Sequence, residues 1–144
     1  MLAGGGITGW PYGLADRVRF YELDALNHVN NVAFLRWFES IRVSYVQDYG
    51  LSRYKPEDPQ LVVRRQCADY LAPMLQNESY IVTARTRLIK ASSLLMDYAV
   101  YSGGVLKAEG DAVIISVEQD GKTRRTHNAE ARARIIAEDG AEEA

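Results

Sequence analysis

The sequence predicts an α+β domain in which one antiparallel β-sheet covers the apolar face of a single long helix. Two observations predict this fold class. Segment 31–49 carries apolar residues at helical spacing, and four segments downstream have the length and composition of strands. Because a helix and a sheet must cover each other's apolar faces, the strands are expected to wrap around the helix.

The long helix has a recognisable start, end and buried side. Asn30 or Asn31 can cap its beginning, and Gly50 follows at a typical stop position, so the helix is expected to run to about Tyr49. At 100° per residue, one broad arc contains Phe34, Trp37, Phe38, Ile41, Tyr45 and Tyr49, extended by Leu35 and Val46. An apolar face this wide suits a helix enclosed by a sheet.

Strands are expected on both sides of this helix. Charged and apolar residues alternate from Arg17 to Phe20, which indicates a half-buried first strand over 16–22. Turn residues separate four later strands, over 61–70, 80–89, 94–101 and 105–117. A short C-terminal helix, capped by Asn128, is expected over 128–137. The expected architecture is a five-stranded antiparallel sheet wrapped around one long central helix, with a short C-terminal helix.

Length and composition indicate one domain. A chain of 144 residues can bury a core of its own, and no repeat or low-complexity linker divides it. The glycine-rich segment 1–15 is expected to be a flexible lead-in, and 16–138 a single domain. The acidic tail over 139–144 is expected to fray.

Charge and cysteine usage argue against several classes of function. The formal net charge is −2, which gives no electrostatic reason to expect a nucleic-acid partner. No run of about 18 apolar residues exists, so no membrane span is expected, and the N-terminal residues lack the pattern of a secretory signal. Cys67 is the single cysteine and the two histidines lie far apart, so neither a disulfide nor a metal site is expected. Cytoplasmic residence is the resulting expectation.

The segment before the long helix concentrates groups that can do chemistry. Asp24, His28 and Asn31 precede or begin the helix, whose unpaired N–H groups and dipole favour negative charge. An oxyanion formed from a carbonyl would be stabilised there, and a carboxylate could attack the carbonyl carbon or deprotonate an attacking water. Aspartate and asparagine are also common helix caps, and a lone histidine is often structural. The residues alone leave both interpretations open.

A longer motif in this region resembles a known family. Residues 19–39 read Arg-Phe-Tyr-Glu-Leu-Asp-Ala-Leu-Asn-His-Val-Asn-Asn-Val-Ala-Phe-Leu-Arg-Trp-Phe-Glu. This run resembles the signature of the hotdog-fold acyl-CoA thioesterases, in the 4-hydroxybenzoyl-CoA thioesterase-like branch: a strand, an aspartate, His-Val-Asn-Asn and an aromatic helix. Weaker matches follow in the right order at 70–73, 90–93 and 121–125. The resemblance therefore covers roughly residues 16–137.

The resemblance implies a hotdog fold and hydrolysis of acyl-CoA thioesters to a free carboxylic acid and CoA. It makes Asp24 the catalytic carboxylate, as nucleophile or as general base for water. The oxyanion donor would be a backbone amide in the first helical turn, at or beside Asn31, and His28 would orient the loop or contact the thioester. Another hotdog lineage uses a helix glutamate as its catalytic carboxylate, but Glu39 is expected to be partly buried and structural.

The resemblance also implies where the substrate binds. Lys90, Ser92 and Ser93 lie where the family binds the nucleotide end of CoA, and one cation with two hydroxyls suits phosphate. Tyr21 is a candidate for the lining of the acyl pocket. CoA is part of the substrate, and no further cofactor is expected. Because the ligand lies between two subunits in this family, self-association as a homodimer or homotetramer is implied.

Two other functions stay open. A hotdog hydratase or dehydratase would also act on acyl thioesters through an Asp and His pair, although the run after His28 continues as it does in thioesterases. A non-catalytic acyl-CoA-binding module would keep the fold without turnover. The acyl specificity depends on contacts between subunits that one sequence does not display. The same is true of the choice between CoA and an acyl carrier protein as thiol carrier.

Overall fold

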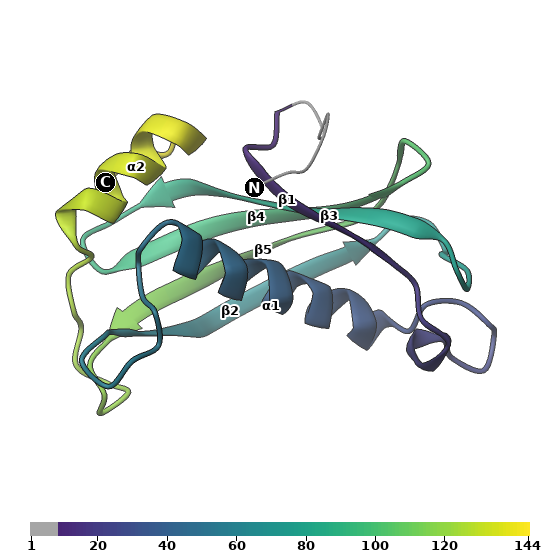
Figure 1. Ribbon diagram of the computed structural model, residues 1–144, viewed down its shortest axis with the longest axis horizontal. Helices are drawn as coiled ribbons and strands as arrows, with labels where there is room; N and C mark the ends of the chain where they lie inside the picture. Colours follow the sequence, from purple (N-terminus) through teal and green to yellow (C-terminus); the bar gives the residue numbers. More distant parts are fainter. Residues whose placement is uncertain (1–8) are drawn as a thin grey trace.

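One curved β-sheet encloses the central helix. The computed structural model describes residues 9–144, and α1 (Asn31–Asp48) lies across the inner face of the sheet (Figure 1). The other elements are β1 (Tyr12–Arg17), the 3-10 helix η1 (Phe20–Glu22), β2 (Gln60–Tyr70), β3 (Ser79–Ile89), β4 (Ser93–Ser102), β5 (Val105–Val117), α2 (Ala129–Asp139) and β6 (Glu142–Glu143). The strand order is β1-β3-β4-β5-β2 with antiparallel neighbours, and β6 adds to β3 in parallel. The prediction of five antiparallel strands around one helix is confirmed, and β6 is an additional strand that was not predicted.

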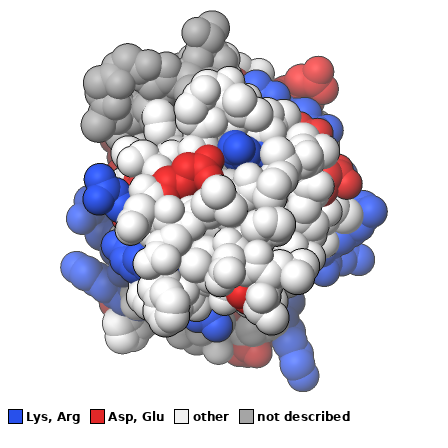
Figure 2. All heavy atoms as spheres, turned by 90° about the vertical axis from the view of Figure 1, so that its right-hand side faces the viewer, with Lys and Arg blue, Asp and Glu red and all other residues white. Residues whose placement is uncertain are grey.

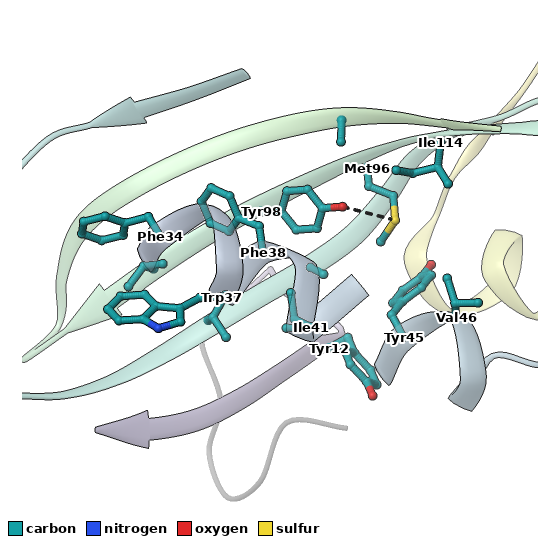
Figure 3. Close-up of a cluster of buried hydrophobic side chains, with 14 of the residues drawn as sticks. Tyr12, Phe34, Trp37, Phe38, Ile41, Tyr45, Val46, Met96, Tyr98 and Ile114 are labelled. Atoms are coloured by element: carbon teal, nitrogen blue, oxygen red, sulfur yellow. Dashed lines mark hydrogen bonds between the residues drawn. The ribbon is translucent and has the colours of Figure 1, made fainter. Parts of the chain in front are cut away.

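The predicted apolar arc of α1 is the side that faces the sheet. Asn30 caps the helix, since its side-chain oxygen accepts the N–H of Val32 at 2.9 Å. The buried face contains Ala33, Phe34, Trp37, Phe38, Ile41, Tyr45 and Val46, each at most 5% exposed. Figure 3 shows Phe38 beside Tyr98 of β4, and these two rings stack with centroids 5.0 Å apart. Full burial of each large apolar side chain contributes about 1.5–3 kcal/mol, so this interface is the main source of stability.

Gly110 allows β5 to pass close to β2 and α1. A methyl group on its Cα would lie 2.4 Å from the carbonyl oxygen of Cys67 and 3.1 Å from the ring of Phe38. Replacing Gly110 by alanine is therefore expected to lower the free energy of unfolding by about 1–3 kcal/mol, measured in urea, because backbone atoms would have to move. Glu109→Ala, exposed on the same strand, is the control and should change it by less than about 0.5 kcal/mol. Equal stability of Gly110→Ala and the wild type would contradict this close packing.

The first strand starts and ends earlier than predicted. It occupies Tyr12–Arg17 instead of 16–22, while Phe20–Glu22 forms a 3-10 helix. The alternation of charged and apolar residues over 17–20 does not mark the buried face of a strand, because Val18 is 1% exposed whereas Phe20 is 75% exposed. The predicted flexible lead-in is wrong for residues 12–15, which belong to the sheet, and its residues 1–8 lie outside the described part of the chain.

The C-terminal residues are held by the sheet, so the predicted fraying over 139–144 is wrong for most of this segment. β6 pairs with Leu88 and Ile89 of β3. The carboxylate of Asp139, the last residue of α2, accepts the N–H of Thr86 at 2.8 Å and the hydroxyl of Tyr49 at 2.9 Å, and also the hydroxyl of Tyr45. Burial raises the pKa of Asp139. These bonds fasten α2 to both α1 and β3.

Candidate functional site

The loop between η1 and α1 is closed by its own backbone hydrogen bonds. The N–H of Asp24 donates to the carbonyl of His28 at 2.8 Å, and the N–H of Asn27 donates back to the carbonyl of Asp24 at 3.0 Å. Asn27 takes a left-handed conformation at φ 60°, which asparagine tolerates better than most residues. Val29 then anchors the loop by donating to the carbonyl of Met74 at 2.8 Å. The position of Asp24 is therefore fixed relative to the start of α1.

The carboxylate of Asp24 has one bonded and one unbonded oxygen. Oδ1 accepts the N–H groups of Leu26 at 2.8 Å and His28 at 3.3 Å. Oδ2 forms no hydrogen bond with any residue from 9 to 144, and the side chain is half-buried. Asp24 thus stabilises its loop as a cap would, and it still presents an oxygen for chemistry.

The first turn of α1 contains one backbone donor that the loop does not use. The side-chain oxygen of Asn30 takes the N–H of Val32, and its carbonyl takes the N–H of Ala33 at 2.9 Å. The N–H of Asn31 makes no hydrogen bond among the described residues. Because the helix dipole places partial positive charge here, this N–H is suited to an oxyanion.

A second carboxylate near the helix start is fully engaged. Glu22 Oε1 accepts the N–H of Arg19 at 2.8 Å, and Oε2 accepts the indole Nε1 of Trp37 at 2.7 Å. Glu22 was not predicted as a site residue, because its partner Trp37 lies fifteen positions away on α1. With both oxygens bonded, Glu22 is a structural link between η1 and α1.

A groove runs along the exposed side of α1 from this loop towards β2. Its first part, a pocket of about 200 Å³, is lined by Tyr21, Glu22, Asn30, Val32, Ala33 and Arg36. Its second part, about 360 Å³, is lined by Val32, Leu35, Arg36, Glu39, Arg42, Val63 and Gln66. Since the two parts share Val32 and Arg36, we treat them as one helix groove. Tyr21 lines it, while Glu39 is exposed in it and not partly buried as expected.

The predicted CoA-binding residues lie at the other end of the sheet. Lys90, Ser92 and Ser93 lie just after the last residue of β3, whereas the first residues of β3 lie beside the Asp24 loop. The eleven residues of β3 span about 33 Å at the usual rise per residue. His127 holds this turn, donating its N–H to the carbonyl of Ala91 at 2.9 Å and placing its ring Nε2 3.2 Å from the carbonyl of Ser93. Burial lowers the pKa of His127, which favours the neutral ring. Lys90, Ser92 and Ser93 therefore lie far from Asp24 of the same chain.

Comparison with known proteins identifies the family. Residues 18–136 match the model of the Thioesterase-like superfamily. The chain belongs to this superfamily. A thioesterase-superfamily structure from Jannaschia sp. CCS1 is 38% identical, with a TM-score of 0.91, covering 96% of this chain and 89% of that one. A thioesterase from Thermus thermophilus, solved with coenzyme A and zinc, is 33% identical, with a TM-score of 0.78, covering 93% and 98%.

A curated relative of this thioesterase-like chain is less informative. The uncharacterized protein YsmA of Bacillus subtilis is 32% identical over 81 residues, which is 56% of this chain. The match spans 54% of that protein, or about half its length. Superfamily membership and the structural similarity together confirm the predicted hotdog fold.

The end of this thioesterase-like domain that carries the Asp24 loop is largely uncharged. Figure 2 faces this end and shows a mostly white surface with few acidic and basic side chains near its centre. Phe20, Tyr21 and Leu26 are each at least 74% exposed here. His28 is half-buried and its ring makes no hydrogen bond with the described part of the chain. An apolar group approaching Asp24 would therefore meet little competing charge.

Two further properties concern metals and membranes. Between residues 9 and 144, no group of three or more His, Cys, Asp or Glu side chains is arranged to hold a metal ion. Over the same range, neither α-helix is long and apolar enough to cross a membrane.

Proposed function

We propose that this chain hydrolyses acyl-CoA thioesters to a free carboxylic acid and CoA. The observation that carries the proposal is that the loop before α1 leaves one carboxylate oxygen of Asp24 unbonded, while the first turn of the helix leaves the N–H of Asn31 unbonded. Membership of the thioesterase-like superfamily supports the reaction class. The coenzyme A bound to the Thermus thermophilus thioesterase, at 33% identity, supports CoA as the thiol carrier.

The geometry suits attack on a thioester carbonyl. The carbonyl oxygen would accept the N–H of Asn31, which stabilises the negative charge that develops on it. Asp24 Oδ2 would then attack the carbonyl carbon, giving an acyl-enzyme anhydride that water hydrolyses, or would deprotonate a water that attacks directly. Either way the C–S bond breaks and CoA leaves as a thiolate that takes up a proton. His28 would orient the Asp24 loop through its backbone.

A homodimer would bring the two ends of the site together. β2 is an eleven-residue strand at one edge of the sheet, free to pair with β2 of a second copy. A two-fold axis makes that pairing antiparallel, so the partner's strands run in reverse. The partner subunit's Lys90, Ser92 and Ser93 would then lie at the end that carries Asp24. An active monomer in light scattering would contradict this assembly.

The test is a screen of short, long and aromatic acyl-CoAs with purified protein, following release of the free thiol. Hydrolysis of at least one class, at a kcat near the usual range of about 1–10³ s⁻¹, is expected. Asp24→Asn serves as the background control. Hydration of an enoyl-CoA without hydrolysis would instead indicate a hydratase. Micromolar binding of CoA esters without turnover would indicate a binding module.

A further inference from the structure

Arg42 is a buried cation with few partners. It lies on α1, is 7% exposed, and donates one side-chain hydrogen bond, from Nη1 to the hydroxyl of Tyr98 at 3.3 Å. It forms no ion pair with the described residues. A guanidinium has five N–H donors, and the nitrogens of Arg42 that make no hydrogen bond still reach solvent, since among residues 9–144 the one buried side-chain polar atom without a partner is Ser116 Oγ. A hydrogen-bond acceptor from outside this chain would satisfy the remaining donors of Arg42.

Arg42 belongs to a charged part of the helix groove. Arg42 lines the second part of the groove together with Arg36, Glu39 and the neutral Gln66. Glu39 lies three residues before Arg42 on the helix, where it could pair with it, but it is exposed and forms no ion pair within residues 9–144. Arg36 and Arg42 carry two positive charges and Glu39 carries one negative charge, so this part of the groove has a net positive charge.

The groove extends from the first turn of α1, next to the proposed reaction centre, to Arg42. Asn30 and Val32, which flank Asn31 in the sequence, line its first part, and Arg36 lies between them and Arg42 along the helix. Ten residues separate Val32 from Arg42, which is about 15 Å of helix, and side chains lean towards the helix N-terminus, which shortens the gap. An acyl group of medium length, with its carbonyl at Asn31, would end at the guanidinium.

Resting on the proposed thioester hydrolysis, we propose that Arg42 is a specificity-determining residue that selects acyl groups ending in a carboxylate. Arginine binds a carboxylate through two parallel N–H···O bonds, and that pair supplies the missing counter-charge. The preferred substrates are then CoA monothioesters of medium-length dicarboxylic acids. Unsubstituted acyl chains of the same length leave the buried guanidinium without its partner.

Suberoyl-CoA and octanoyl-CoA test this preference, because they differ by one terminal carboxylate. The kcat/KM of the wild type is expected to be at least about 10-fold higher for suberoyl-CoA. In Arg42→Met, which keeps an unbranched apolar stem but removes the charged head, this ratio should fall by about 10-fold or more. Glu39→Gln should raise the ratio, because it removes the competing anion. Arg17→Met, at an exposed position on β1, should leave the ratio unchanged.

A binding measurement separates this inference from the proposed hydrolysis. Calorimetry with Asp24→Asn protein gives the Kd of each ester without turnover, and the same preference for suberoyl-CoA is expected. Preferential binding without hydrolysis in the wild type would support the role of Arg42 and overturn the proposed reaction. Hydrolysis of both esters at equal kcat/KM, or an unchanged ratio in folded Arg42→Met, would overturn the role of Arg42. If Arg42→Met instead weakens self-association and leaves the ratio unchanged, Arg42 pairs with a second copy of the chain and the inference is wrong.

Discussion

Asp24→Asn is expected to lower kcat for thioester hydrolysis by about 10²–10⁴-fold, because an amide can neither attack the carbonyl carbon nor accept the proton of water. The fold should survive the change. Asparagine keeps the Oδ1 that accepts the N–H groups of Leu26 and His28, so the loop retains both hydrogen bonds. Thiol release measures kcat, and circular dichroism should give a melting temperature close to that of the wild type.

Two further variants separate catalysis from loop structure. Asp24→Ala removes the Oδ1 acceptor as well, so it should lose activity and about 1 kcal/mol of stability. Asp120 is a matched control, since its Oδ1 also accepts two backbone N–H groups, from Lys122 and Thr123, but it lies after β5 and not in the loop before α1. Asp120→Asn should keep wild-type kcat. Wild-type turnover in Asp24→Asn would show that Asp24 is only a cap.

Asp139→Ala is expected to lower the free energy of unfolding by about 3 kcal/mol or more, because it leaves several buried donors without an acceptor. These donors are the hydroxyls of Tyr45 and Tyr49 and the N–H of Thr86. Urea unfolding measures the loss. Glu138→Ala, next to it on α2, is the control. Its exposed ion pair with Arg134 should contribute less than about 1 kcal/mol.

The same site should make stability depend on pH. Burial raises the pKa of Asp139 above its unfolded value, so the folded state holds the proton more tightly. The resulting stabilisation is complete below about pH 4 and is lost as the pH rises through the raised pKa. Asp139→Asn cannot ionise, so the stability difference between the wild type and this variant should be larger at pH 4 than at pH 7. An equal difference at both pH values would argue against a raised pKa.

Features that depend on neighbouring residues in the sequence were predicted well. Helical spacing, with Asn30 before it and Gly50 after it, gave α1 nearly to the residue. Asp24 and Asn31 were singled out together because one loop and one helix start hold both, and their catalytic roles stay a prediction. The first strand was placed four residues too late because Gly9 and Pro11 resemble a loop, although proline is tolerated at the margin of an edge strand.

Features that depend on distant contacts were not predicted. Glu22 is engaged by Trp37 of α1, and Arg42 is buried because Tyr98 of β4 faces it across the core. No local pattern marks either residue. Asp139 looked like part of an acidic tail, since its partners on α1 and β3 are at least 53 positions away. In the proposed homodimer, the relation of Lys90 to Asp24 would depend further on a second chain.

The unequal edges of the sheet bear on whether copies of this protein form a closed pair or an open filament. One edge of the sheet is β2, with eleven residues. The other edge is formed by the six-residue β1 and the two-residue β6, which both pair with β3. A sheet with two long free edges can add chains at both and polymerise. In this protein, two copies joined through β2 would pair their long edges with each other and leave only the short edges exposed. Growth would stop at the pair, which favours a soluble assembly over fibres.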